Sequence, residues 1–122
     1  TSNTNNNIPQ VPLVLSFTFD GFPGETGWNL FCGDQIMIME RPFNYYDGNP
    51  FMTLDEIMLV PLGSTCTFTI QDSFGDGMCC QQGDGSYTFY YGDDTVVGDS
   101  NFVLVKGGVF GTEEVKTFVV EM

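Results

Sequence analysis

The sequence predicts an all-β protein, an antiparallel two-sheet sandwich of jelly-roll type held by disulfide bonds. The chain of 122 residues holds 15 glycines and 12 phenylalanines. That composition is typical of turn-rich β proteins with aromatic cores and disfavours helices. Apolar and polar residues also alternate in short runs between turn signals, with no helical periodicity. This pattern favours a sandwich, with a closed barrel as the lesser option.

The individual strands follow from period-two alternation, and glycine, proline and aspartate mark the turns between them. The expected strands are Leu13 to Phe19, Trp28 to Cys32, Gln35 to Glu40, Met52 to Leu62, Cys66 to Ile70, Tyr87 to Tyr91, Thr95 to Val97, Asn101 to Val105 and Val115 to Val120. The second and third of these are expected to form a hairpin with its turn at Gly33-Asp34. Residues 1–12 are rich in Asn and Pro and cannot build a core, so we expect an amino-terminal extension or linker there. Residues 13–122 then form a single β-sandwich domain.

The charge balance limits the partners of this protein. Sixteen acidic and three basic residues give a formal net charge of −13, which opposes nucleic acid and anionic membrane surfaces through Coulomb repulsion. No apolar run approaches the roughly 18 residues of a membrane span, so we expect no membrane insertion. The chain also lacks an initiator Met and a signal-like apolar segment, which indicates a processed chain that is secreted, extracellular or at the cell surface.

Four cysteines without any histidine predict two disulfide bonds and therefore an oxidising compartment. A zinc site is disfavoured because Cys79-Cys80 lacks the spacing of zinc ligands. Adjacent cysteines seldom bond each other, since such a bridge strains the peptide between them. We therefore expect Cys32 and Cys66 each to bond one of Cys79 and Cys80, in either order.

Aspartates and glycines are concentrated in the segment Asp72-Ser-Phe-Gly-Asp-Gly-Met-Cys-Cys80. Asp72 and Asp76 can direct carboxylate oxygens at one point, while the glycines free the backbone to turn its carbonyls inward. If the first strand and the strand that ends at Asp72 are neighbours in one sheet, Asp20 and Glu25 join them. Four such carboxylates repel each other unless a cation lies between them, which predicts a Ca²⁺ site. The alternative is that Asp72 and Asp76 cap turns by bonding their own backbone.

Aromatic residues in the loop from Arg41 to Pro50 are candidate ligand contacts. This loop contains two prolines and a glycine and carries Tyr45 and Tyr46. We expect one of the two rings to point outward, where it could stack on a sugar or on a second copy of the chain. The alternative is an ordinary half-exposed tyrosine. Trp28, by contrast, is expected to anchor the core or its rim.

Four blocks of the sequence together resemble a known kind of secreted module. The blocks are Leu15-Ser-Phe-Thr-Phe-Asp20 with Pro23-Gly-Glu-Thr-Gly-Trp28, Cys66-Thr-Phe-Thr-Ile-Gln-Asp-Ser-Phe-Gly-Asp-Gly-Met-Cys-Cys80, Gly83-Asp-Gly-Ser-Tyr87 and Gly108-Val-Phe-Gly-Thr-Glu-Glu114. The chain resembles, over most of its length, modules appended to extracellular proteases and surface proteins of marine bacteria, diatoms and other algae. The resemblance implies a non-catalytic extracellular β module. The Arg41 to Pro50 loop departs from that pattern by being longer.

An enzymatic function is not expected. Without histidine there is no Ser-His or Cys-His relay, and oxidised cysteines offer no thiolate. A carboxylate pair could cleave glycosides, but no residue pattern marks a raised-pKa acid in a long cleft. The sequence therefore predicts a calcium-binding adhesion module that contacts extracellular polysaccharide or protein. The alternative is a structural protomer of an extracellular fibre that self-assembles through its amino-terminal extension.

Overall fold

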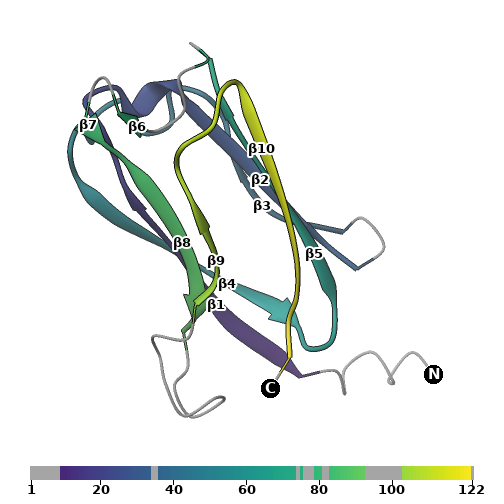
Figure 1. Cartoon of the computed structure of the whole chain (residues 1–122). Helices are drawn as coiled ribbons and strands as arrows, with labels where there is room; N and C mark the ends of the chain where they lie inside the picture. The colour runs from purple at the N-terminus through teal and green to yellow at the C-terminus, as the bar shows by residue number, and fades with distance from the viewer. Residues whose placement is uncertain are drawn as a thin grey trace.

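The computed structural model describes residues 9–33, 36–73, 75, 79–80, 83–92 and 103–121, with 79–80 and 83–84 as backbone only. Two four-stranded antiparallel sheets pack face to face (Figure 1), which confirms the predicted all-β sandwich. The helical content of the described residues is one short 3-10 element, η2 (Pro23–Glu25). Nothing helical in this part of the chain could span a lipid bilayer.

The first sheet contains the amino-terminal strand and has the order β4-β1-β8-β9. Its strands are β1 (Gln10–Thr18), β4 (Thr53–Pro61), β8 (Ser86–Tyr91) and β9 (Val103–Gly107). Strand β1 is central and pairs with β4 on one side and β8 on the other. Its residues Leu13, Leu15 and Phe17 are fully buried between the sheets, as their alternation predicts.

The second sheet has the order β10-β5-β2-β3. Its strands are β2 (Thr26–Cys32), β3 (Ile36–Arg41), β5 (Thr65–Asp72) and β10 (Glu113–Val119). The predicted hairpin is confirmed, because β2 and β3 pair antiparallel with a bulge between Leu30 and Phe31. Two short strands, β6 (Cys79–Cys80) and β7 (Gly83–Asp84), form a ribbon at the upper end of the molecule in Figure 1.

The first strand begins earlier than the sequence pattern suggested. Strand β1 starts at Gln10, and Val11 is already buried in the core. Pro12 fits within the strand because its carbonyl accepts a hydrogen bond from the amide of Gly92 at 2.8 Å, although it has no amide hydrogen of its own. The amino-terminal extension is therefore shorter than residues 1–12. Residues 1–8 and the expected strand Thr95 to Val97 lie outside the described residues.

Aromatic side chains hold the two sheets together. Phe68 of β5 lies at the centre of the core, with its ring centroid 4.8 Å from that of Phe89 and 5.1 Å from that of Tyr87, both on β8 of the facing sheet. Trp28 lies 5.8 Å from Phe68 on the other side and is almost fully buried, so its predicted role as an anchor is confirmed. Burial of such large rings stabilises a sandwich of this size.

The disulfide bond differs from the prediction. Cys32 and Cys66 bond each other, so the expected pairing of each with Cys79 or Cys80 is wrong. The two residues face each other directly on neighbouring strands β2 and β5, with Cα atoms 4.1 Å apart. Strand register, which sequence spacing does not reveal, decides this pairing. The side chains of Cys79 and Cys80 lie outside the described residues.

Candidate functional site

Three chain segments meet at one end of the sandwich, which we call the loop end: Asp20–Glu25, the Pro42–Met52 loop, and Ser73 after β5. Backbone hydrogen bonds join them. The amide of Ser73 donates to the carbonyl of Glu25 at 2.9 Å, and the amide of Asn44 donates to the carbonyl of Gly24 at 2.8 Å. The long loop therefore folds back over η2 and forms one surface with the end of β5.

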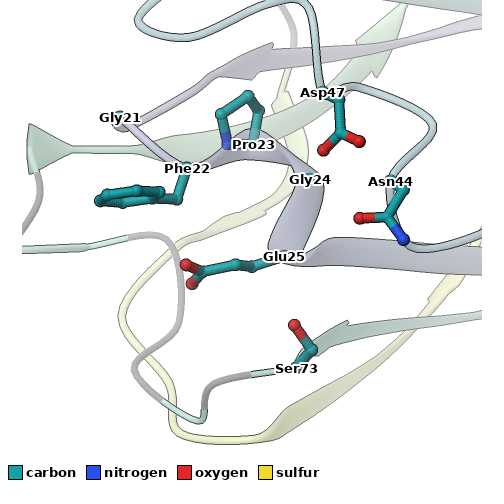
Figure 2. A pocket seen from close by; sticks show the side chains of 8 residues that line it. All are labelled: Gly21, Phe22, Pro23, Gly24, Glu25, Asn44, Asp47 and Ser73. Atoms are coloured by element: carbon teal, nitrogen blue, oxygen red, sulfur yellow. The ribbon is translucent and has the colours of Figure 1, made fainter.

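A pocket of about 310 Å³ opens at this loop end (Figure 2). Its polar lining comes from Glu25, Asn44, Asp47 and Ser73, which supply carboxylate, amide and hydroxyl groups. The remaining lining residues are Gly21, Phe22, Pro23 and Gly24. A concave site with a few convergent polar groups is the usual form of a small-ligand or sugar site.

The Asp47 side chain lies directly against Gly24 in this pocket. A Cβ atom on Gly24 would overlap the Asp47 carboxylate, so that side chain would have to turn away, and the Asn44 side-chain oxygen lies 3.4 Å from the same position. Two loop residues, Asn44 at φ 73° and Phe51 at φ 60°, adopt left-handed backbone conformations that cost energy outside glycine. The loop is thus held in a defined and partly strained shape, as binding loops often are.

The segments that form the pocket carry exposed aromatic side chains. Phe22 lines the pocket itself, and Tyr45, which is 53% exposed, lies with the exposed Phe43 and Phe51 on the Pro42–Met52 loop. The Arg41 guanidinium lies 4.6 Å from the centroid of the Tyr45 ring, a cation–π contact that fixes the orientation of this ring. The prediction that one tyrosine of the pair points outward is confirmed, and Tyr45 is that residue.

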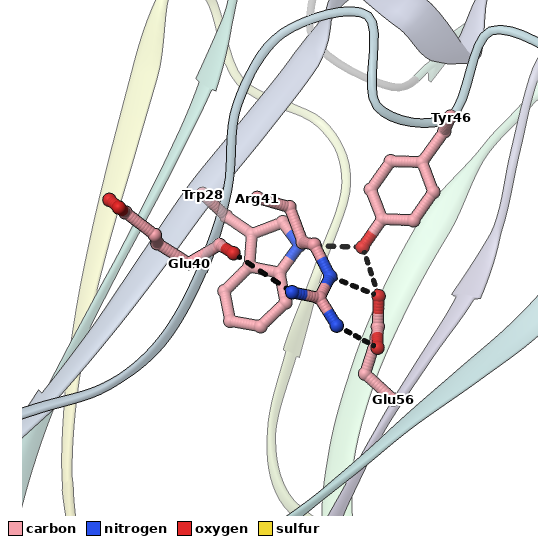
Figure 3. Close-up of polar contacts among 5 residues, drawn as sticks. All are labelled: Trp28, Glu40, Arg41, Tyr46 and Glu56. Carbon is pink, nitrogen blue, oxygen red and sulfur yellow. Dashed lines mark hydrogen bonds and ion pairs between the residues drawn. The ribbon is translucent and has the colours of Figure 1, made fainter.

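Tyr46 cannot contact a ligand, because it is 0% exposed; its place among the predicted binding residues is corrected. Its hydroxyl accepts a hydrogen bond from Trp28 Nε1 at 2.9 Å and donates one to Glu56 Oε2 at 2.8 Å (Figure 3). Arg41 completes this network with two bonds to the Glu56 carboxylate, at 2.9 and 3.0 Å. Burial is the main cause that raises the pKa of Tyr46, so the phenol stays neutral.

The predicted metal ligands lie at the loop end, but in a different arrangement from the one expected. Asp20 follows β1 and Asp72 ends β5, and these strands belong to opposite sheets rather than to one sheet. Both aspartates are buried, and Glu25 between them is half-buried. One carboxylate oxygen of Asp20 accepts a bond from the amide of Phe22 at 2.9 Å, so Asp20 caps its own turn.

The fourth predicted ligand, Asp76, lies outside the described residues. Among the residues that are described, no group of three or more Asp, Glu or Cys side chains is placed to hold a metal ion. The described carboxylates therefore do not form a complete calcium site by themselves, and calcium stays a prediction.

Sequence reasoning missed Asn44, Asp47 and Ser73 as lining residues of the pocket. Asn44 and Asp47 flank the tyrosine pair, and Asp47-Gly48 is a typical turn signal, so they could have been marked as loop residues. Their approach to Gly24 depends on how the long loop folds back, which local pattern does not determine.

Comparison of the chain with protein-family models, with curated proteins and with solved structures finds no match. A function for this protein therefore has to be argued from its own residues.

Proposed function

We propose that this protein is a non-catalytic extracellular module that binds polysaccharide through its loop end and so mediates adhesion at the cell surface or matrix. The observation that carries the proposal is the polar pocket of Glu25, Asn44, Asp47 and Ser73, on segments that also present the exposed aromatic residues Phe22 and Tyr45. A protein surface is the second kind of partner that the same loops could contact.

The chemistry of this end suits sugars. Aromatic rings such as Tyr45 and Phe22 can pack against the apolar faces of sugar rings, while carboxylate and amide oxygens accept hydrogen bonds from sugar hydroxyls. A formal charge of −13 repels sulfated or uronate-rich polymers. Neutral polysaccharides are therefore the favoured class.

Calcium binding is part of this proposal. Asp20, Glu25 and Asp72 each lie at the loop end without forming a metal-binding group, and Asp76 follows Asp72 closely in sequence. In the proposal these four residues would supply oxygen ligands to the ion. A bound cation would offset their mutual repulsion and tie the loops of the two sheets together. The ion would act on stability and on loop shape, and would indirectly support sugar binding.

An extracellular location is proposed on the disulfide bond. The Cys32–Cys66 bond joins two buried cysteines across neighbouring strands, and such bonds persist mainly in oxidising compartments. Secretion or display at the cell surface is consistent with this chemistry.

The proposal is tested by pull-down with insoluble polysaccharides. We expect the protein to be retained by at least one of cellulose, chitin, mannan or β-1,3-glucan, and not by alginate. Tyr45→Ala should weaken retention, because it removes the outward ring. It also removes the edge contact of that ring with the buried Tyr46, so thermal unfolding verifies that the variant is folded. The matched control is Tyr90→Ala, which removes a ring from the outer face of the first sheet, on β8. If no polysaccharide retains the protein, or if both variants bind as well as the parent, the loop end is not a glycan site.

The alternative function is that of a fibre protomer, and one observation favours it. Strand β4 pairs only with β1 among the described residues, and its outward Ile57 and Leu59 are 67% and 59% exposed. An exposed apolar edge strand is a ready site for strand addition from another copy. The amino-terminal extension predicted to make that contact lies outside the described residues.

Sedimentation separates the two functions. A fibre protomer sediments as a large particle, and either Ile57→Lys or deletion of residues 1–8 abolishes that particle. The deletion stops at residue 8 so that β1 stays intact. An adhesion module sediments as a monomer with or without these changes.

A further inference from the structure

The outer face of the second sheet carries further depressions that line up with the loop-end pocket. One of about 180 Å³ is lined by Gly27, Trp28, Asn29, Glu40, Arg41, Pro42, Phe43 and Gln71. Another of about 330 Å³ is lined by Phe31, Gly33, Thr65 and Thr67. Together with the loop-end pocket they lie beside successive parts of strand β2.

Strand register explains this alignment. Gly27 pairs with Gln71, Asn29 with Thr69 and Phe31 with Thr67. Directly opposed residues on adjacent strands point to the same face, and their alternating neighbours on β2 and β5 are core residues, so this set faces outward. The eight residue steps from Gly33 to Glu25 span about 26 Å along the strand direction.

Below Gly27 and Gln71, the outward residues on strands β2, β5 and β10 carry no charge. They are Asn29, Phe31, Thr65, Thr67, Thr69, Val115, Thr117 and Val119. On the neighbouring strand β3, Glu40 pairs with Asn29 and places a carboxylate at the edge of this uncharged region. Hydroxyl, amide, aromatic and aliphatic groups are the mixture that contacts uncharged sugars. In a chain with net charge −13, such a face is compatible with a neutral partner and offers no attraction to an ionic one.

Within the largest depression, Phe31 supplies the aromatic surface and Thr65 and Thr67 supply hydroxyls. Gly33 adopts φ 66°, and a Cβ built on it meets no atom within 4 Å, so the space above it is open. The volume of about 330 Å³ falls within the range of small-ligand sites. Phe43, whose ring lies over Gly27, lines the depression between this region and the loop end.

We infer that a linear neutral polysaccharide lies along β2, from the loop-end pocket to the depression at Phe31, so that the protein binds an extended chain rather than a single sugar. This inference rests on the proposed function and deepens it by assigning an extended, linear ligand and a second contact region. Each depression holds part of the chain, and affinity accumulates along the strand.

The inference is tested by calorimetric titration with neutral oligosaccharides of the type retained in the pull-down, namely cello-, chito-, manno- or laminari-oligosaccharides from the disaccharide to the hexasaccharide. We expect affinity to rise with length until the ligand spans about 26 Å. Thr67→Glu, which places a carboxylate beside Phe31, should weaken the hexasaccharide about tenfold and leave the disaccharide nearly unchanged.

The matched control is Thr53→Glu, which adds the same charge at an exposed threonine of the other sheet and should bind like the parent. Thermal unfolding verifies that each variant is folded, and Thr65→Glu on the same depression replaces Thr67→Glu if the latter unfolds.

Two results together overturn the extended site while the loop-end site stands. They are an affinity that does not depend on oligosaccharide length and hexasaccharide binding that is unaltered in the Thr67→Glu or Thr65→Glu variant. Absence of binding by the parent to every oligosaccharide and polysaccharide overturns the proposed function itself.

Discussion

Arg41, the sole arginine of the chain, links the edge strands β3 and β4 of the two sheets. The Pro42–Met52 loop begins at the next residue. Arg41 ends β3 of one sheet and bonds the carboxylate of Glu56 on β4 of the other, while Tyr46 and Trp28 extend the network into the core. Each buried polar atom named here has a partner, which is the condition for such a network to stabilise a fold. The same arginine orients Tyr45, so the network also supports the exposed ring.

Glu56→Gln should lower the free energy of unfolding by about 2 kcal/mol, a value between those of exposed and fully buried ion pairs because the Arg41 side chain is partly exposed. The measurement is urea denaturation. Asp55→Asn is the control, since it removes a carboxylate from the same strand on the opposite face. Equal stability of the two variants would show that the network contributes little.

Buried tyrosines make stability depend on alkaline pH. Burial raises the pKa of both Tyr46 and Tyr87. The hydrogen bond that Tyr87 donates to Glu114 raises the pKa of Tyr87 further. The unfolded chain releases these protons near pH 10 while the native state retains them. The contribution of the two tyrosines to the free energy of unfolding is therefore fully present below about pH 10. Above that pH the free energy of unfolding falls by about 1.4 kcal/mol per pH unit for each tyrosine.

Denaturation between pH 8 and 11.5 measures this slope; this interval brackets the tyrosine pKa of about 10 in the unfolded chain. Tyr87→Phe should reduce the slope above pH 10 while leaving the lower range flat. A slope identical to that of the parent would mean that Tyr87 titrates normally in the folded protein.

At the scale of the elements, one disulfide bond joins β2 and β5, the two central strands of the second sheet. Cys32 and Cys66 close a loop of 34 residues between β2 and β5, and such a bond contributes about 2 to 4 kcal/mol, largely by restricting the unfolded chain. Replacing both cysteines with alanine should lower stability by at least that amount, because the buried volume is also reduced.

Peptide mapping checks the pairing directly. A protease that cleaves after acidic residues separates Cys66 from Cys79 at Asp72 and Asp76. Under non-reducing conditions the Cys32 and Cys66 peptides should remain linked to each other. Recovery of either one linked to the Cys79-Cys80 peptide would contradict the assigned bond.

Most strands could be predicted because alternation is a local signal. The run through Leu13, Leu15 and Phe17 and the turn at Gly33 were sufficient to place β1 and the β2–β3 hairpin. Which strands share a sheet was not predictable, because it depends on long-range pairing. For this reason Asp20 and Asp72 were expected in one sheet and are found on opposite sheets.

The candidate site was only partly predictable for the same reason. Glu25 and Tyr45 were identified from composition and turn signals, and both lie at the loop end. Tyr46 was assigned outward because sequence does not distinguish the two neighbours in a loop. Its burial follows from partners distant in sequence, Trp28 and Glu56, that satisfy its hydroxyl.

For the molecule as a whole, the charge of −13 opposes folding through self-repulsion. Calcium should therefore raise the melting temperature, and chelation should lower it by several degrees. Asp72→Asn should reduce this response. The control is added NaCl or MgCl₂ at matched ionic strength, since screening alone also stabilises an acidic protein. A calcium effect no larger than that of the matched salts would remove calcium from the account.

Backbone amide resonances, followed during titration with a retained neutral oligosaccharide, locate the glycan on the protein surface. If the loop end binds glycan, the largest shifts occur at Phe22–Glu25 and Asn44–Asp47, with further shifts along the outer residues of β2 when the ligand is long. Shifts confined to the outer face of β4 and β1, or the absence of any shift at saturating ligand, would contradict glycan binding at the loop end.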